Sequence, residues 1–400
     1  MTTRSLVNGD FVRQALKKAF DWLASYELSC VLFLLLLLLT YLGTLYQVEH
    51  GLYQAQHVYF ESLVLVQWVF GAIPIPLPGT YLLLIVLAVN LTLGGIIRVR
   101  MGWSKFGTLV THAGILVLLV GAFVSYRYAV AGHLTLYEHE SSNEFQSSNE
   151  WEIAVGEATG GPAREYLIPA RAFTNLRGAL SRSFRFPDLP FDVTLHGFSP
   201  NARPMPATAA GGDAVDGFVL APREAEREQE ANQAGVLATI RETQGGAEKK
   251  AILWAGAYEP WVVQAGGKTW SVDLRLRRWT LPFTVTLDKF TRELHPQTNM
   301  ARKFTSDVTK TEEGVAQKAR ITMNEPLRNL GYTLYQSSWG PSNARPGDRL
   351  YSVFAVVRNP TERFAISALC VPHHHTGACN PFHAEVGGVP SIREQEIAVK

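Results

Sequence analysis

The segment FGTLVTHAGILVLLVGAFVSY, from Phe106 to Tyr126, has 21 residues and contains no Asp, Glu, Lys or Arg. An α-helix of this length can cross the hydrocarbon core of a bilayer. One histidine, His112, interrupts the apolar run. A titratable side chain inside a membrane span is costly and by default indicates a functional site. Two interpretations of His112 stay open here: a ligand or proton relay, and an imidazole that hydrogen-bonds a neighbouring helix.

Two further apolar runs precede this segment, Leu28 to Tyr46 and Thr80 to Ile97. Each is long enough to span a membrane, so we expect a bundle of three transmembrane helices. The first run is not a cleaved signal peptide, because its apolar part is too long and no small-residue cleavage site follows.

The distribution of Lys and Arg predicts the orientation of the spans. The N-terminal arm and the loop 98–105 are basic, whereas the loop 47–79 has no Lys or Arg. Basic loops stay in the cytoplasm, so everything after the third span should lie outside. His112 is then roughly 9 Å from the cytoplasmic boundary. The apolar stretch 63–73 is too short to span, and we expect it at the outer membrane interface.

From residue 132 onward the sequence consists of short alternating segments separated by Gly, Pro, Ser and Asn. This pattern is typical of strands and turns, and we expect a sandwich-like, mainly antiparallel β domain of about 230 residues. The clearest helix candidate in it is Pro222 to Ala234. An internal similarity also stands out: LPFDVTLHGF (189–198) and LPFTVTLDKF (281–290) share seven of ten positions. It favours two similar β units, although proline-led strands can also converge on such a pattern.

Motifs for soluble enzyme chemistry do not occur. The three cysteines, Cys30, Cys370 and Cys379, form no CxxC or metal-spaced pair. There is no dinucleotide fingerprint, P-loop, GxSxG or HExxH motif. We therefore assign no catalytic residue and no metal site, and we expect no nucleic-acid partner.

Several segments, however, resemble one known family. The stretches 42–62, 103–125 and 281–296 resemble parts of ResB-type cytochrome c biogenesis proteins, the second including the histidine. ITMNEPLRNLGYTLYQSSW (321–339), followed by VFAVVRNP (353–360), resembles the end of their exported domain. Together these matches are scattered over most of the chain.

The resemblance implies a bacterial-type inner membrane protein of the System II pathway. Such proteins work with a ResC/CcsA-type membrane partner to move haem across the membrane and attach it to CxxCH motifs of apocytochromes c. Carried over, His112 would be an axial ligand of a transient b-type haem shared with that partner. A neutral imidazole costs far less in lipid than a charge, and the inner-half position matches the side where haem is made.

Other residues are weaker candidates. His50 and His57 in the outer loop could meet haem or the partner, or could simply be solvated. Tyr335, Gln336 and Trp339 could shape a surface for the apocytochrome or the partner, or belong to a core strand with a buried tryptophan.

The C-terminal end departs from the family. A fourth span should follow the VRNP strand, but FAISALCV (364–371) stops at Pro372. We expect a truncated or frameshifted helix there and do not interpret His373 to His375 as a metal site. Translating the other reading frames beyond codon 371 tests this, and finding no apolar run would contradict it.

The expected organisation follows from these observations. In chain order it is a cytoplasmic arm (1–27), a first helix (28–46), an outer loop (47–79), a second helix (80–97), a cytoplasmic loop (98–105), a third helix (106–126), a β-rich domain (127–360) and an atypical tail (361–400). The leading function is a haem-handling subunit of a membrane cytochrome c synthase complex, embedded in lipid. One alternative is a non-catalytic scaffold that recruits apocytochrome without ligating haem. The other is a membrane sensor, against which the lack of a cytoplasmic output domain counts.

Overall fold

The computed structural model describes residues 3–69, 72–99, 102, 105–158, 164–207, 214–243, 245–296, 301–341, 343–345, 347–361 and 398–399. They divide into two compact units. The first contains the described residues up to Ala129 together with Pro360 and Thr361, and it is mainly helical. The second begins at Val130 and is built mainly from strands.

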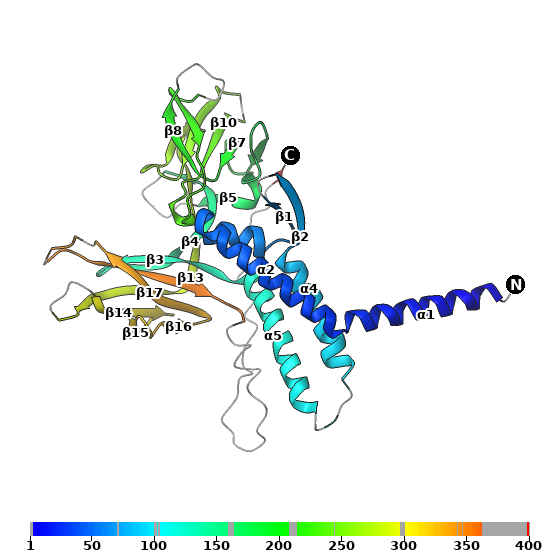
Figure 1. The fold of residues 1–400 in the computed structure, drawn as a ribbon. Helices are drawn as coiled ribbons and strands as arrows, with labels where there is room; N and C mark the ends of the chain where they lie inside the picture. Colours follow the sequence, from blue (N-terminus) through cyan, green and yellow to red (C-terminus); the bar gives the residue numbers. More distant parts are fainter. Residues whose placement is uncertain are drawn as a thin grey trace. The chain divides into compact units, whose positions relative to one another are not determined.

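The helical unit contains the three predicted apolar helices. Within the described residues, three helices are long and apolar enough to cross a membrane: Tyr26–His50, Thr80–Ile97 and Phe106–Tyr128 (Figure 1). The elements of this unit are α1 (Thr3–Leu23), α2 (Tyr26–His50), α3 (Leu52–Ala55), the π-helix η1 (Gln56–Phe60), strands β1 (Val64–Val69) and β2 (Ile73–Pro78), α4 (Thr80–Asn90), the π-helix η2 (Leu91–Ile97) and α5 (Phe106–Tyr128).

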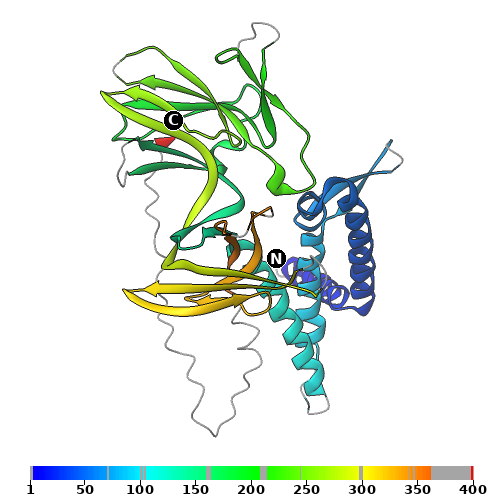
Figure 2. The same ribbon diagram turned by 90° about the vertical axis from the view of Figure 1, so that its left-hand side faces the viewer.

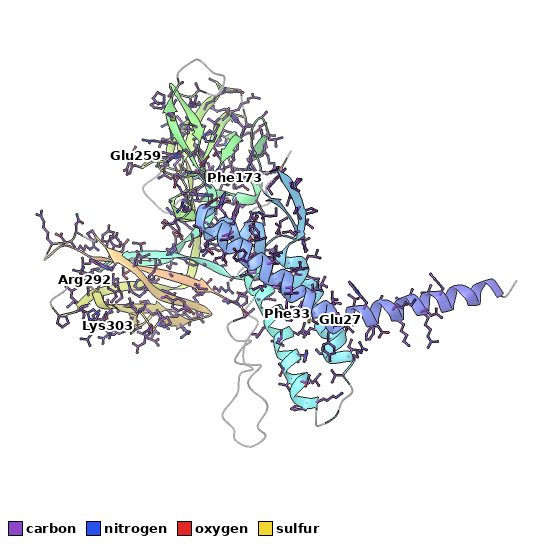
Figure 3. All side chains as sticks on the ribbon, in the orientation of Figure 1. Glu27, Phe33, Phe173, Glu259, Arg292 and Lys303 are labelled. Carbon is purple, nitrogen blue, oxygen red and sulfur yellow. The ribbon has the colours of Figure 1, made fainter. Side chains whose placement is uncertain are left out.

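The first span begins at a sharp corner after α1. Ser25 is extended and caps α2, because its hydroxyl accepts a hydrogen bond from the Leu28 N–H (3.2 Å). The span ends at Gly51, whose φ of 83° is one that side chains rarely adopt. Many of its apolar side chains point away from the bundle, such as Phe33, labelled in Figure 3.

The loop between the first and second apolar helices contains an antiparallel hairpin. Strands β1 and β2 pair from Val64 with Pro78 to Val69 with Ile73. The hairpin projects from the helices as a two-stranded ribbon (Figure 2). Its prolines all lie on β2, which pairs only with β1 in the described chain, and proline is tolerated on such edge strands.

The second unit is mainly antiparallel β structure, as predicted. Its main sheets have the orders β11-β10-β7-β6-β19 and β15-β14-β13-β4-β3-β18-β17-β16, with β12 on β13 and β5 on β4. The strands are β3 (Val130–Tyr137), β4 (Ser141–Glu157), β5 (Glu165–Pro169), β6 (Ser181–Arg185), β7 (Phe191–Ser199), β8 (Ala202–Pro206), β9 (Phe218–Pro222), β10 (Gly235–Glu242), β11 (Lys249–Trp254), β12 (Trp261–Ala265), β13 (Lys268–Leu294), β14 (Ala301–Glu312), β15 (Val315–Thr322), β16 (Leu327–Asn329), β17 (Tyr332–Gly340), β18 (Tyr351–Arg358) and β19 (Ala398–Val399). A short helix, α6 (Ala170–Phe173), follows β5.

Two hydrophobic cores lie along the paired long strands β4 and β13. Figure 2 shows the corresponding strand groups, one green and one yellow to orange. The two similar ten-residue segments belong to different cores. In each, the residues at positions one, three, five, seven and ten are buried: Leu189, Phe191, Val193, Leu195 and Phe198 in one core, and Leu281, Phe283, Val285, Leu287 and Phe290 in the other. These residues, which the two segments share, therefore form the buried face of β7 in one core and of β13 in the other.

The helix expected from Pro222 to Ala234 is wrong. Strand β9 ends at Pro222, and only a single 3₁₀ turn, Gln229–Ala231, follows. Two asparagines take the backbone groups that a helix would use: the Glu226 N–H donates to Asn232 Oδ1 (2.9 Å), and Asn201 Nδ2 donates to the Glu224 carbonyl (2.6 Å). Side chains of this type compete with helical hydrogen bonds.

The predicted truncated span at 364–371 and the histidines 373–375 lie outside the described residues, as do Cys370 and Cys379.

Candidate functional site

His112 lies in the second turn of α5, and its imidazole is half-buried. Its Nδ1 is 2.7 Å from the Thr108 carbonyl oxygen, one turn earlier in the same helix. A carbonyl oxygen only accepts hydrogen bonds, so Nδ1 carries the proton and, in the neutral imidazole, Nε2 keeps its lone pair. Metal-ligating histidines commonly donate their other ring N–H to a backbone carbonyl in this way.

The imidazole of His112 packs against the backbone of the second span at Gly95. A β-carbon built on Gly95 would lie 2.4 Å from Cδ2 and 2.8 Å from Cγ of His112. Such distances are far below van der Waals contact, so the ring occupies space that glycine alone leaves open. Gly95 belongs to the π-helix η2, and π-helical turns are frequent at functional sites.

The residues just before Gly95 fix the second span to the corner between α1 and α2. Asn90 is buried, and its Nδ2 donates to the carbonyls of Leu23 (2.7 Å) and Ser25 (2.9 Å). Its Oδ1 accepts a hydrogen bond from the Ser29 hydroxyl (2.7 Å). At Gly94 a β-carbon would meet the Ala24 carbonyl oxygen at 2.9 Å. Polar bonds and close backbone approach of this kind hold helices together in lipid, where apolar burial does not.

The third span offers a large uncovered surface. None of the side chains of α5 is buried, and Phe123, Leu118 and Phe106 are among its most exposed apolar residues. Such a helix needs cover from lipid or from other helices.

His50 and His57 each contact a residue four positions away in the sequence. The His50 ring stacks on Tyr46 with ring centres 3.9 Å apart, and its Nδ1 lies 3.3 Å from the Tyr46 carbonyl. His57 Nδ1 lies 3.0 Å from Glu61 Oε2, and its side chain is 74% exposed. Helix α2 begins at the corner that lies against η2 and ends at His50. At 1.5 Å per residue, these two ends of α2 are about 36 Å apart. The structure therefore does not bring His50 to His112.

The predicted β-domain residues divide between interior and surface. Gln336 accepts a hydrogen bond from Ser306 (2.7 Å) and donates to Ser352 (2.8 Å), and both serines are fully buried. Trp339 stacks on Phe290 with ring centres 5.7 Å apart. These contacts agree with the core-strand interpretation of Gln336 and Trp339, whereas Tyr335 is exposed.

A partly buried ionic cluster connects β13 to β4 and β5. Arg275 Nε lies 3.0 Å from Glu152 Oε1, and its two terminal nitrogens hold both oxygens of Glu165. Glu152 is only 3% exposed. The hydrogen bonds from Arg275 lower the pKa of Glu165, against the opposing effect of partial burial. Because Arg275 pairs with both carboxylates, we interpret this cluster as a structural feature of the β unit.

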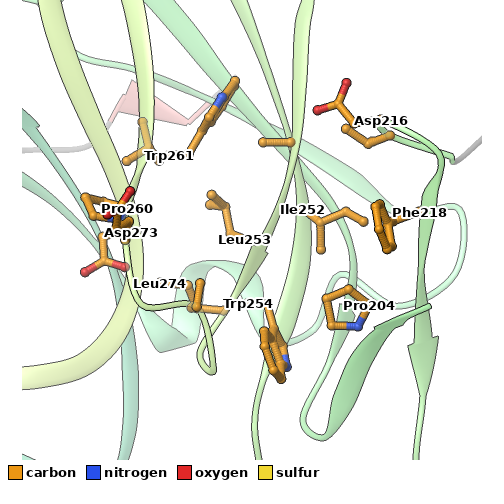
Figure 4. Close-up of a pocket in the computed structure, with 15 residues that line it drawn as sticks. Pro204, Asp216, Phe218, Ile252, Leu253, Trp254, Pro260, Trp261, Asp273 and Leu274 are labelled. Carbon is orange, nitrogen blue, oxygen red and sulfur yellow. The ribbon is translucent and has the colours of Figure 1, made fainter. Parts of the chain in front are cut away.

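A groove of about 330 Å³ opens beside the edge strands β11 and β12 (Figure 4). Trp254, Trp261 and Phe218 contribute aromatic surface, and the acidic residues Asp216, Glu259 and Asp273 lie among its lining residues. Among the residues that the structure describes, no Lys or Arg lines it. The groove therefore suits an apolar segment that carries positive charge.

A comparison with known protein families finds a match in the C-terminal part of the β unit. Residues 250–365 match the ResB-like family. This stretch is ResB-like. The match is consistent with a ResB-like protein and indicates a role in cytochrome c biogenesis, where ResB proteins work in a complex. The ResB-like stretch contains β12 to β18, including Arg275, Gln336 and Trp339, but not His112. Among curated proteins, none matches the chain.

Sequence reasoning missed Asn90, Gly94 and Gly95. The signal was present: one asparagine interrupts the apolar run of the second span, and a Gly-Gly pair follows four residues later. Polar and small residues in a span indicate helix contacts. The π-helical turn η2 determines that Gly95 contacts His112. The sequence carries no comparable signal for that turn.

Proposed function

We propose that this chain is a membrane subunit of a System II cytochrome c synthase complex, in which His112 binds haem on its way across the bacterial inner membrane. The observation that carries this proposal is the tautomer of the His112 imidazole. Nδ1 donates to the Thr108 carbonyl, which leaves Nε2 as an electron-pair donor inside an apolar span. The ResB-like stretch supports the pathway.

The residues present fit half of a haem site. Haem in a membrane protein is commonly held by one or two axial nitrogens, and this chain offers one near Gly95. His50, the candidate at the other end of α2, is too far away to be the second. A ResC/CcsA-type partner would supply the other ligand and cover the exposed surface of α5. Haem is the cargo that is attached to CxxCH thiols, and His112 holds and orients it.

The proposed topology places the β unit outside the membrane and the Arg98 end of the second span inside. Arg98 and Lys105 flank the short loop between α4/η2 and α5, and basic loops remain cytoplasmic. His112 is then near the side where haem is made.

Coexpression with a ResC/CcsA-type partner and a CxxCH reporter tests the proposal. Covalent haem on the reporter, measured by peroxidase staining after denaturing electrophoresis, should fall to background for His112→Ala. His50→Ala is the matched control, because it removes an imidazole at the far end of the bundle. Wild-type levels of reporter haem in His112→Ala would contradict the proposal.

The groove favours a second candidate function, recruitment of the apocytochrome without haem ligation. The part of its apolar and acidic lining from Ala251 to Leu274 lies at the start of the ResB-like stretch. The groove also lies beside two strands that pair on one side only in the described chain. In that case Trp254→Ala combined with Glu259→Lys should abolish reporter maturation while His112→Ala leaves it unchanged. The reverse pattern favours haem ligation.

A further inference from the structure

Helix α1 has one apolar and one polar face. At about 100° per residue, Phe11, Val12, Ala15, Leu16 and Trp22 fall on one side. Arg13, Gln14, Lys17 and Asp21 fall on the other, and Lys18 lies at the boundary. The large apolar side chains are 54–72% exposed, so the described chain leaves this face uncovered.

The start of the first span fixes where α1 leaves the bundle. The Asn90 side chain donates to Leu23 and Ser25, on the two sides of the corner. The backbone of Ala24 lies against Gly94, and Ala24 is buried. The end of α1 is thus held against the second span, and α1 runs out from this corner (Figure 1).

The depth of the corner matches that of a helix in the membrane interface. Gly94 lies three residues before the end of the second span at Ile97, or about 4.5 Å along the helix. Amphipathic helices lie with their apolar face roughly 5–10 Å into the boundary between headgroups and acyl chains. A helix that leaves a span at this depth therefore enters the interfacial layer.

The charges of α1 favour anionic lipid. Arg13, Lys17 and Lys18 outnumber the single acid Asp21 in the part of α1 whose side chains are described. Basic residues flanking an apolar face are attracted to negatively charged headgroups, whose contribution is about 1 kcal/mol per residue near the surface.

We propose that α1 lies in the plane of the membrane interface, with its apolar face in the acyl region and its basic residues on anionic phospholipid headgroups, on the side of the bilayer that holds the loop between η2 and α5. This inference is independent of haem ligation by His112, because it rests on α1 and its corner.

Spin-label accessibility in the full-length protein tests it. Single cysteines are placed in turn at residues 11–22 after Cys30, Cys370 and Cys379 have been changed to serine. The labelled protein is reconstituted in phosphatidylcholine vesicles with and without phosphatidylglycerol. Labels replacing Val12, Leu16 and Ala19 should be reached by oxygen, and labels replacing Gln14 and Lys17 by a water-soluble nickel chelate, with a period of 3.6 residues. Omitting phosphatidylglycerol should reduce the immersion.

Two substitutions to glutamate provide matched controls on opposite faces. Leu16→Glu should lift the remaining labels toward water, and Gln14→Glu should leave their immersion largely unchanged. Uniform nickel accessibility along α1 would overturn the proposal. So would apolar positions shielded from both reagents, because they would then be covered by protein.

Discussion

The imidazole of His112 occupies the space that a side chain on Gly95 would fill, and this contact joins the third span to the second. The contact fixes one face of the ring, while the hydrogen bond from Nδ1 to Thr108 fixes its tautomer. The lone pair on Nε2 is therefore positioned by Gly95 and by the backbone carbonyl of Thr108.

Replacing Gly95 by alanine should weaken haem binding by the assembled complex. Its β-carbon collides with the His112 ring, which must rotate or move away. Changes in the surroundings of a metal ligand typically cost about 10–100-fold in affinity. Helix propensity alone would make Gly95→Ala favourable by about 1 kcal/mol, so a loss of binding cannot come from a poorer helix.

Gly107→Ala is the control for that substitution, because a β-carbon there meets nothing within 4 Å. Haem titration followed by absorbance should separate the two variants. Equal affinities would show that the contact does not position the ring.

A cysteine pair tests the same contact without haem. A β-carbon on Gly95 would lie 3.2 Å from that of His112, close to the roughly 3.5–4.5 Å found across disulfides. In a chain whose native cysteines are replaced by serine, Gly95→Cys with His112→Cys should cross-link readily under mild oxidation. Gly94→Cys with His112→Cys should not, because Gly94 faces Ala24. Cross-linking is read by mass spectrometry, and equal yields would contradict the register of the two helices.

The β unit should depend on Arg275. Glu152 is nearly fully buried beside it, and Arg275→Met would leave that carboxylate without its cation. Breaking a buried pair from one side costs about 3–5 kcal/mol, whereas an exposed pair contributes at most about 1 kcal/mol. Urea unfolding of the full-length protein in detergent should therefore show a large loss for Arg275→Met. Arg320→Met, which breaks an exposed pair with Asp307, should show a small one.

The same cluster predicts a dependence of stability on acid. The pKa of Glu165 is lowered by its hydrogen bonds to Arg275, so the folded protein holds this carboxyl in its charged form. That contribution is fully present above the unfolded pKa, about 4.3, and is lost as the pH falls through the lower folded value. The difference in unfolding free energy between wild type and Glu165→Gln should thus shrink in acid. A difference that stays constant from neutral pH into the acid range would contradict the prediction.

The three long apolar helices were predictable because their length and lack of charge permit few other structures. The inward faces of β7 and β13 were predictable because a period of two marks a strand with one buried side. Both signals are local to the sequence.

The contact between His112 and Gly95 was not predictable in the same way. It depends on which face of η2 meets α5, and the π-helical turn shifts that face relative to a regular helix. The hairpin β1–β2 was missed because a short apolar run is ambiguous by periodicity alone. The helix expected at Pro222 to Ala234 failed because charged residues of high helix propensity have no apolar face to bury there, and asparagine side chains offered competing bonds.

The absorbance spectrum of the purified complex with its ResC/CcsA-type partner tests haem ligation by His112 most directly. Wild type and His50→Ala should show the Soret and visible bands of haem with two histidine ligands, and His112→Ala should lose them or shift to a five-coordinate spectrum. Identical spectra for wild type and His112→Ala, at equal haem content, would contradict ligation by this residue.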